Sequence, residues 1–112
     1  MHIINTTPNG QIFTCGSCDK LHIEFGNLYF LLTRTELNSF AQYIDSVDYT
    51  FYLAKNKNMQ MRKKLIMKLR FKDVYLALNV NEFLELTDLL SLKKRPQKVS
   101  ARLIMNDCIY LN

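Results

Sequence analysis

The sequence predicts an α+β fold: a mainly antiparallel sheet built from two related β-hairpin–helix (ββα) repeats, with two helices packed on one face. Three observations support this prediction. One stretch of the chain matches another 46 positions later, each stretch alternates in polarity like a hairpin before it becomes helical, and each contains a helix-capping signal. Neither repeat is large enough to be stable alone, so we expect both to contribute to one sheet and one core.

The internal repeat covers residues 21–46 and 67–92. The aligned positions with the same residue in both copies are Phe25/Phe71, Tyr29/Tyr75, Leu32/Leu78 and Glu36/Glu82. No linker or low-complexity segment divides the chain, so we interpret residues 1–112 as a single domain. The tail, residues 96–112, is predicted to be ordered, either as an edge strand or as an arm onto another subunit of an oligomer.

Each hairpin is predicted from a two-residue turn, Gly26-Asn27 in the first copy and Lys72-Asp73 in the second. A two-residue loop fixes the register, so that residue 25 faces residue 28 and opposed residues share one side of the sheet. The inward sets that follow are wholly apolar: Leu21, Ile23, Phe25, Leu28, Phe30 and Leu32 in the first copy, and Met67, Leu69, Phe71, Val74, Leu76 and Leu78 in the second.

Both helices are predicted from capping boxes, formed by Thr33 with Glu36 and by Asn79 with Glu82. Apolar residues then recur at helical spacing, which extends the first helix to about Ser46 and the second to about residue 92. Outside the repeat the sequence predicts extended chain. A strand over residues 11–15 follows a turn, residues 49–53 are rich in β-forming residues, and residues 60–71 make a long basic strand that leads into the second hairpin.

The composition, the N-terminal residues and the cysteine count predict a cytoplasmic protein. Of the 112 residues 48% are hydrophobic, yet no apolar run approaches the ~20 residues that span a bilayer. The first residues lack the basic and apolar regions of a signal peptide, and three cysteines, an odd number, argue against a disulfide scaffold. We therefore expect a cytoplasmic location and no membrane partner.

The net charge of +5 is unevenly spread and suggests a partner. Residues 1–48 carry two basic and five acidic side chains, whereas residues 49–112 carry thirteen basic and five acidic ones. The predicted basic face consists of Arg62, Lys63, Lys64, Lys68, Arg70 and Tyr75. Cations beside aromatic rings on an open sheet can hold phosphates and stack bases, although a solvated sheet face guarded by lysines is the commoner meaning of such charge.

The motif Cys15-Gly-Ser-Cys18 can form half of a tetrahedral zinc site. Cys108 with His22 or His2 would complete the ligands within one chain, and a second Cys15/Cys18 pair would complete them across a dimer. The alternative is two reduced thiols that pack as small hydrophobic groups, with no cofactor at all. A thioredoxin-like redox role is weaker, because strand-like sequence rather than a helix follows Cys18.

No enzyme class is supported by the sequence. It has no nucleophile elbow, no glycine-rich phosphate loop and no histidine pair, and nothing brings two catalytic carboxylates together. Glu36 and Glu82 are explained by their capping roles. We predict no catalytic residue and no small-molecule substrate.

Several of these features together resemble one family, an uncharacterised group of small bacterial proteins catalogued as a domain of unknown function. The resemblance depends on Asn9-Gly10, Cys15-x-x-Cys18, the hairpin sequence of residues 21–30, the Thr33/Glu36 helix start and the basic residues 62–64, and it covers about residues 9–92. It implies a small cytoplasmic bacterial protein with no assigned activity.

The sequence thus favours a small non-enzymatic module that works through protein contacts or self-association, with a protein partner or a homo-oligomer. The first alternative is a nucleic-acid-binding module that uses the basic second half of the chain. The second is a zinc-knuckle or redox protein that uses Cys15 and Cys18.

Overall fold

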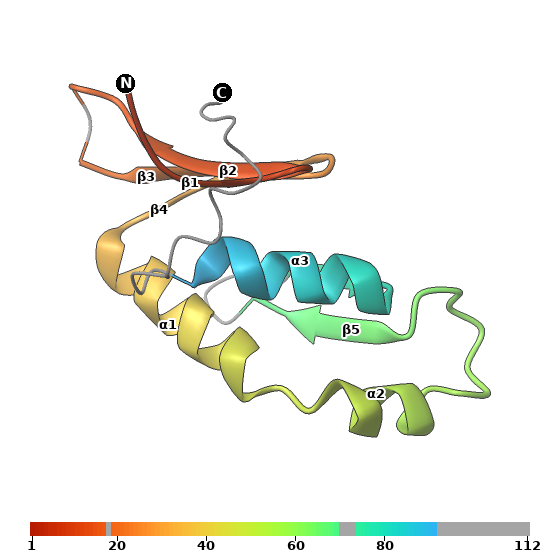
Figure 1. The fold of residues 1–112 in the computed structure, drawn as a ribbon. Coiled ribbons are helices and arrows are strands. Elements are labelled where there is room, and N and C mark those ends of the chain that lie inside the picture. Colours follow the sequence, from red (N-terminus) through yellow and green to blue (C-terminus); the bar gives the residue numbers. More distant parts are fainter. Residues whose placement is uncertain (18, 70–73, 92–112) are drawn as a thin grey trace.

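The described part of the chain folds into two antiparallel sheets and three helices, which confirms the α+β class (Figure 1). The computed structural model describes residues 1–17, 19–69 and 74–91. The elements in chain order are β1 (His2–Thr7), β2 (Gly10–Thr14), β3 (Leu21–Phe25), β4 (Leu28–Leu32), α1 (Arg34–Ser46), α2 (Tyr49–Lys55), β5 (Leu65–Lys68), β6 (Tyr75–Leu78) and α3 (Val80–Leu90).

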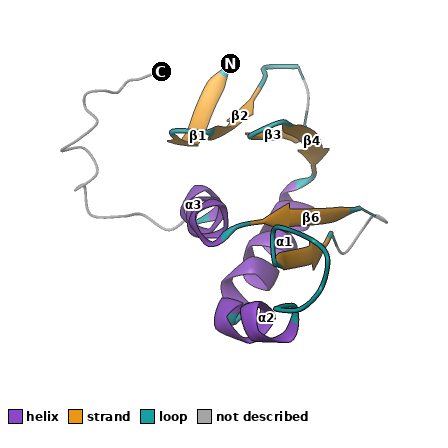
Figure 2. Ribbon diagram, turned by 90° about the vertical axis from the view of Figure 1, so that its right-hand side faces the viewer, coloured by secondary structure: helices purple, strands orange, loops and turns teal. Residues whose placement is uncertain are grey.

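The two hairpins of the repeat lie in separate sheets, so the prediction of one shared sheet is wrong. Strands β1 to β4 form one sheet in chain order, and among the described strands β5 pairs with β6 alone. Figures 1 and 2 show α3 between the four-stranded sheet and the β5–β6 hairpin. The physical reason is the N-terminal hairpin β1–β2, which has no counterpart in the second repeat. It pairs with β3 and provides the surface on which α3 packs.

The predicted register of the first hairpin is correct. Phe25 faces Leu28 and Leu21 faces Leu32, with Gly26 in the left-handed turn conformation at φ +60°. In the second hairpin the predicted register is wrong by two residues: a two-residue turn at Lys72-Asp73 would place Met67 opposite Leu78, whereas Met67 faces Leu76 and Leu65 faces Leu78. A shift of two residues keeps every side chain on its predicted face, because side chains alternate with a period of two. The strand before that turn is shorter than predicted, because only Leu65–Lys68 is paired. Phe71, Arg70 and the turn pair Lys72-Asp73 lie outside the described residues.

The inward sets form one core with the helices. From the hairpins the buried residues are Ile12, Leu21, Ile23, Phe25, Leu32, Leu65, Met67, Leu69, Leu76 and Leu78. From the helices they are Leu37, Phe40, Ile44, Phe83, Leu86, Leu89 and Leu90. Leu28 and Val74 were predicted to be inward as well, but both are exposed, because each lies at the end of its hairpin.

Both capping boxes are present. The Thr33 hydroxyl accepts a hydrogen bond from the Glu36 amide at 3.1 Å, and the Asn79 side chain accepts one from the Glu82 amide at 2.8 Å. Each glutamate in turn accepts from the amide of its cap residue. The first helix has the predicted bounds, and the second ends at Leu90, slightly earlier than predicted.

Residues 49–55 are a helix, so the prediction of extended chain over residues 49–53 is wrong. Asp48 caps this helix by accepting hydrogen bonds from the Thr50 amide and hydroxyl. Tyr49, Tyr52 and Leu53 then pack against the core at helical spacing. Tertiary packing on one side of the segment thus outweighs the strand propensity of its aromatic residues.

The N-terminal segment is a full strand rather than only a lead into a turn. Strand β1 pairs with β2, and a bulge interrupts its register between Ile3 and Asn5. The predicted strand over residues 11–15 corresponds to β2. The tail that was predicted as an edge strand or oligomer arm lies outside the described residues.

Gly10 offers a test of how closely the N-terminal hairpin packs on α3. A Cβ at this position would lie 2.8 Å from the Glu24 carbonyl oxygen and 2.8 Å from a methyl group of Leu89. We expect Gly10→Ala to lower the free energy of unfolding by about 1–3 kcal/mol, since backbone must move to make room. Chemical denaturation would measure the loss.

Gly16→Ala is the matched control, because no heavy atom lies within 4 Å of the corresponding Cβ position. Its unfolding free energy should stay within about 0.5 kcal/mol of wild type. Equal effects of the two substitutions would contradict the close packing described here.

Candidate interaction surface of the four-stranded sheet

The four-stranded sheet has one face turned away from the helices, which we call the outer face. Strand alternation places two rows of side chains on it. Cross-strand register aligns Ile3, Phe13, His22 and Leu31 in the first row and Thr6, Gln11, Glu24 and Tyr29 in the second. Among the elements that the structure describes, the helices pack on the opposite side of this sheet (Figure 1).

Polar groups on the outer face bind one another. The rings of Phe13 and His22 stack with centroids 4.7 Å apart, and the Nδ1 atom of His22 lies 2.6 Å from the Tyr29 hydroxyl oxygen. Gln11 donates a hydrogen bond to Glu24 at 2.8 Å. The prediction that His22 lies on the face opposite the core is correct.

Apolar groups on the outer face remain open to solvent. Ile3 is 38% exposed, Tyr29 is 55% exposed and Leu31 is 43% exposed. Tyr29 and Leu31 belong to β4, which is the edge strand of the sheet. An apolar surface with a polar border is typical of a surface that binds another protein.

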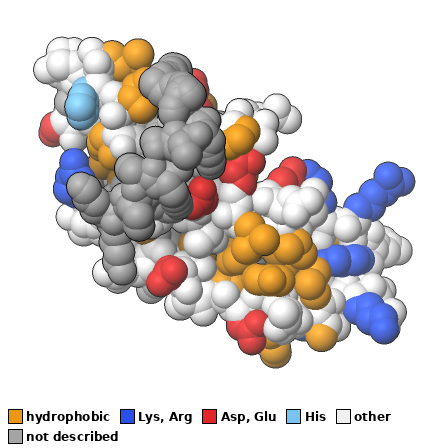
Figure 3. Space-filling model, viewed as in Figure 1, with side chains coloured by type: hydrophobic (Ala, Val, Ile, Leu, Met, Phe, Trp, Pro, Cys, Tyr) orange, Lys and Arg blue, Asp and Glu red, His pale blue; other side chains and the backbone are white. Residues whose placement is uncertain are grey.

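A second apolar surface lies over α3 (Figure 3). A groove of about 560 Å³ runs between α1 and α3 with an apolar floor that includes Ala41, Ile44 and Leu90. Leu84 is the large hydrophobic residue of α3 that is exposed. The border of the groove is polar or acidic (Asn38, Gln42, Asp45, Thr87, Asp88 and Ser91).

The predicted metal ligands are not brought together in the described part of the chain. Cys15 takes part in a disulfide bond, so the predicted alternative of two reduced thiols is wrong for Cys15. An oxidised sulfur is not a zinc ligand either. Cys18 and Cys108 lie outside the described residues, and His22 contacts Phe13 and Tyr29. Within the described residues no three His, Cys, Asp or Glu side chains lie close enough to hold a metal ion.

The predicted basic face is brought together only in part. Lys68 and Tyr75 lie on the side of β5–β6 away from the core, as predicted, and the structure pairs them across the two strands. Lys63 instead forms an ion pair with Glu82 at 3.0 Å, and Lys64 donates a hydrogen bond to the Met59 carbonyl at 2.7 Å. Arg62 is exposed, and Arg70 lies outside the described residues.

Further cations lie near α2. Lys and Arg side chains project from the end of the molecule where α2 connects to β5 (Figure 3). Lys55 lies 5.8 Å from the ring centroid of Phe51 and 5.9 Å from that of Tyr52. The cations of residues 49–69, the described part of this basic region, are therefore spread over this end rather than concentrated on one sheet face.

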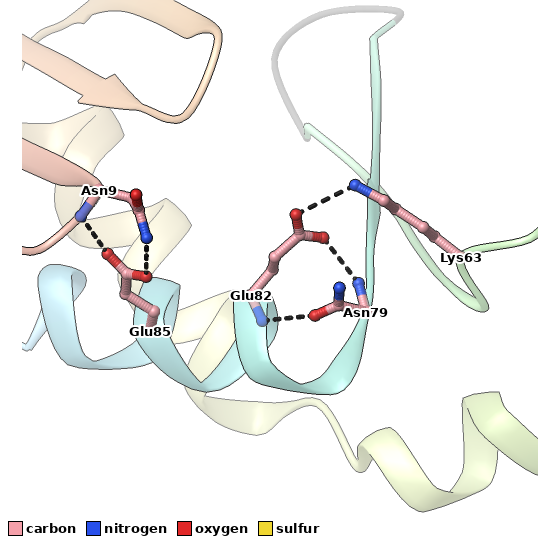
Figure 4. Close-up of polar contacts among 5 residues, drawn as sticks. All are labelled: Asn9, Lys63, Asn79, Glu82 and Glu85. Carbon is pink, nitrogen blue, oxygen red and sulfur yellow. Dashed lines mark hydrogen bonds and ion pairs between the residues drawn. The ribbon is translucent and has the colours of Figure 1, made fainter.

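A cavity of about 480 Å³ separates the tip of the β3–β4 hairpin from strand β6. Its polar lining consists mainly of Asn9, Lys63, Glu82 and Glu85, and Figure 4 shows how they are bonded. Glu85 accepts hydrogen bonds from the Thr7 hydroxyl at 2.6 Å, the Asn9 amide at 2.7 Å and the Asn9 side chain at 2.9 Å. This cluster binds the β1–β2 turn to α3.

The pKa values of both carboxyl groups are lowered by these contacts. The backbone hydrogen bond from Asn79 lowers the pKa of Glu82, and Lys63 lowers it further. For Glu85 the largest single effect is partial burial, which raises its pKa. The hydrogen bonds from Thr7 and Asn9 together outweigh it, so the pKa of Glu85 lies below its ordinary value.

The role of Glu85 was not predicted from the sequence. Its partners are more than 70 positions away in the chain, and no local pattern connects them. The same holds for Asn5, whose side chain donates hydrogen bonds to the Asp88 and Leu89 carbonyls at the end of α3. Both residues dock the N-terminal hairpin on α3.

Comparison with protein families matches this chain to one family, described as "Family of unknown function (DUF6686)", over residues 1–111. The chain belongs to this family. The predicted resemblance to a domain of unknown function is thus confirmed, and the DUF6686 match extends well beyond the expected residues 9–92. Comparison with the curated proteins and with the solved structures gave no match.

None of the helices that the structure describes in this DUF6686 protein is long and apolar enough to cross a membrane.

Glu85 makes a pH-dependent contribution to stability that can be measured. Because its folded pKa lies below the ordinary 4.5, its stabilising effect is complete above that pH and is lost as the pH falls through the folded value. We expect Glu85→Gln to lower the unfolding free energy at pH 7 by about 1 kcal/mol, and the difference from wild type to shrink by pH 3. Thermal or urea unfolding across this pH range would show it.

Asp45→Asn is the control, since Asp45 is exposed on α1. Its unfolding free energy should follow the wild-type pH dependence closely. A constant difference between Glu85→Gln and wild type from pH 7 to pH 3 would argue against the ionised contact.

Proposed function

We propose that this protein is a small non-enzymatic module that works through protein contacts, made by the outer face and the β4 edge of its four-stranded sheet. The observation that carries the proposal is the exposure of Ile3, Tyr29 and Leu31 on a sheet face whose polar groups are already bonded to one another. A partner can cover such a surface without leaving buried polar groups unpaired.

The bonding of the other polar clusters is consistent with this proposal. Glu82 and Glu85 line a cavity, but each is used to cap or dock α3, so neither is available as a general acid or base. His22 is the histidine of the outer face, and its ring is stacked on Phe13. An aromatic and aliphatic surface with a satisfied polar border suits recognition better than chemistry.

Photo-crosslinking in cells would test this proposal. A benzoylphenylalanine residue in place of Tyr29 should give one or more discrete adducts, identified by mass spectrometry as this chain or as a second protein. Leu31→Lys, which places a charge on the proposed surface, should lower the yield of these adducts several-fold.

Phe51 is a matched control position, because it is 57% exposed, close to the 55% of Tyr29, but lies on α2. The crosslinking residue there should not give the same adducts. Identical adducts from both positions, or none from position 29, would overturn the proposed role of the outer face.

A nucleic-acid-binding role is the second candidate, and one observation favours it. Lys68 lies directly across from the exposed Tyr75 on the open side of β5–β6, where a cation and a ring can contact a phosphate and a base. Lys55 with Phe51 repeats this combination on α2.

Binding to a labelled single-stranded RNA would test this second candidate. The affinity for RNA should fall steeply between about 50 and about 200 mM salt, because each phosphate contact releases counterions. The double variant Lys68→Glu, Tyr75→Ala should reduce the affinity at least about tenfold. The lost stacking accounts for about 1–3 kcal/mol per base, and the lost positive charge adds to it.

Lys20→Glu, a charge change outside β5–β6, is the control. Equal loss in both variants would indicate only a general charge effect.

A further inference from the structure

Strand β4 is an edge strand without the features that normally prevent edge pairing. Its five residues, Leu28–Leu32, carry no charge, no proline and no bulge. The opposite edge, β1, has a bulge between Ile3 and Asn5 and polar side chains, both of which discourage pairing. Strand β5 ends in Lys68 and follows Lys63 and Lys64. Unguarded apolar edge strands tend to pair with another chain.

The hairpin register identifies the backbone groups at this edge. Phe25 and Leu28 flank a two-residue turn and therefore form a hydrogen-bonded pair. Such pairs alternate along an antiparallel ladder, so Phe30 also bonds to β3, whereas the N–H and C=O groups of Tyr29 and Leu31 point away from it. In the described part of the sheet no strand lies beyond β4.

We propose that β4 pairs antiparallel with β4 of a second copy of this chain, about a twofold axis at Phe30, so that two four-stranded sheets join into one. This inference rests on the proposed function, of which it names the partner. At this register Tyr29 of each copy faces Leu31 of the other, and each of these residues exchanges its outward backbone hydrogen bonds with its opposite.

The strand is self-complementary at this register. Tyr29 and Leu31 both lie on the outer face, so an aromatic–aliphatic pair forms twice across the axis. On the inner face Leu28 lies opposite Leu32, and Leu28 is exposed in the single chain. A register centred on Leu31 would instead bring Leu28 toward the first turn of α1 at Arg34, where pairing cannot continue.

Other exposed surfaces fit a second copy less well. Strand β6 is also uncharged, but its residues line the cavity beside the β3–β4 tip, so its edge faces the same molecule. The groove between α1 and α3 has an acidic and amide border that repeats the same charges on any second copy. The β4 edge combines free backbone groups with matching apolar side chains on both faces.

Sedimentation equilibrium of the full chain, with amide hydrogen exchange measured by NMR, would test this inference. We expect a concentration-dependent dimer in which the Tyr29 and Leu31 amides become protected at least about tenfold on dimerisation. The Phe30 amide should change little, because it already bonds to β3. Leu31→Lys should raise the dimer dissociation constant at least about tenfold.

Leu84→Lys is the matched variant on the competing surface, since Leu84 is 47% exposed, compared with 43% for Leu31. It should change the dissociation constant less than about twofold. Circular dichroism would verify that both variants fold, and a dimer broken by Leu84→Lys but not by Leu31→Lys would overturn the inference in favour of the α1–α3 groove.

Two further results would overturn the inference, and they differ in what they mean for the proposed function. A chain that stays monomeric up to millimolar concentration, yet crosslinks from position 29 to a different protein, would exclude self-pairing but support a protein-binding outer face. A monomer that gives no position-dependent crosslink would exclude both.

Discussion

The packing of α3 is the constraint on which the rest of the structure depends. Phe83, Leu86, Leu89 and Leu90 are buried, and the helix lies between the four-stranded sheet and the β5–β6 hairpin. Because β1 and β2 rest on α3 while β2 pairs with β3, the N-terminal hairpin connects the second hairpin–helix segment to the first. Glu85 and Asn5 stabilise this contact with hydrogen bonds at the two ends of the same interface.

That arrangement explains how two similar sequences acquire different surroundings. The first hairpin becomes half of a larger sheet, whereas the second remains a two-stranded unit against the helices. Each hairpin therefore keeps its apolar inner face, but their outward faces differ. Tyr29 lies beside His22 and Leu31 on an apolar surface, and Tyr75 lies opposite Lys68 on a basic one. Two similar hairpin–helix segments can thus share one core pattern and differ in the surface that they present to a partner.

The position of the N-terminal hairpin determines which part of the four-stranded sheet is exposed. By pairing with β3 on one side, β2 leaves β4 at one edge of the described sheet, with β1 at the other. The polar side chains of the outer face are bonded to one another across strands, which makes the remaining apolar groups the accessible ones. Membership of a family of unknown function adds no activity to this description, so the argument for function depends on the surface itself.

Local sequence determined the elements whose causes are local. The two-residue turn at Gly26-Asn27 set the register of β3–β4, and the Thr33/Glu36 and Asn79/Glu82 boxes set the helix starts, because each signal involves residues within a few positions of one another. Only the tertiary structure decided that residues 49–55 are helical, that the hairpins lie in separate sheets and that Glu85 joins the β1–β2 turn to α3. Those outcomes depend on contacts between residues distant in the chain, where packing and hydrogen bonding outweigh local propensity and leave no periodic pattern in the sequence.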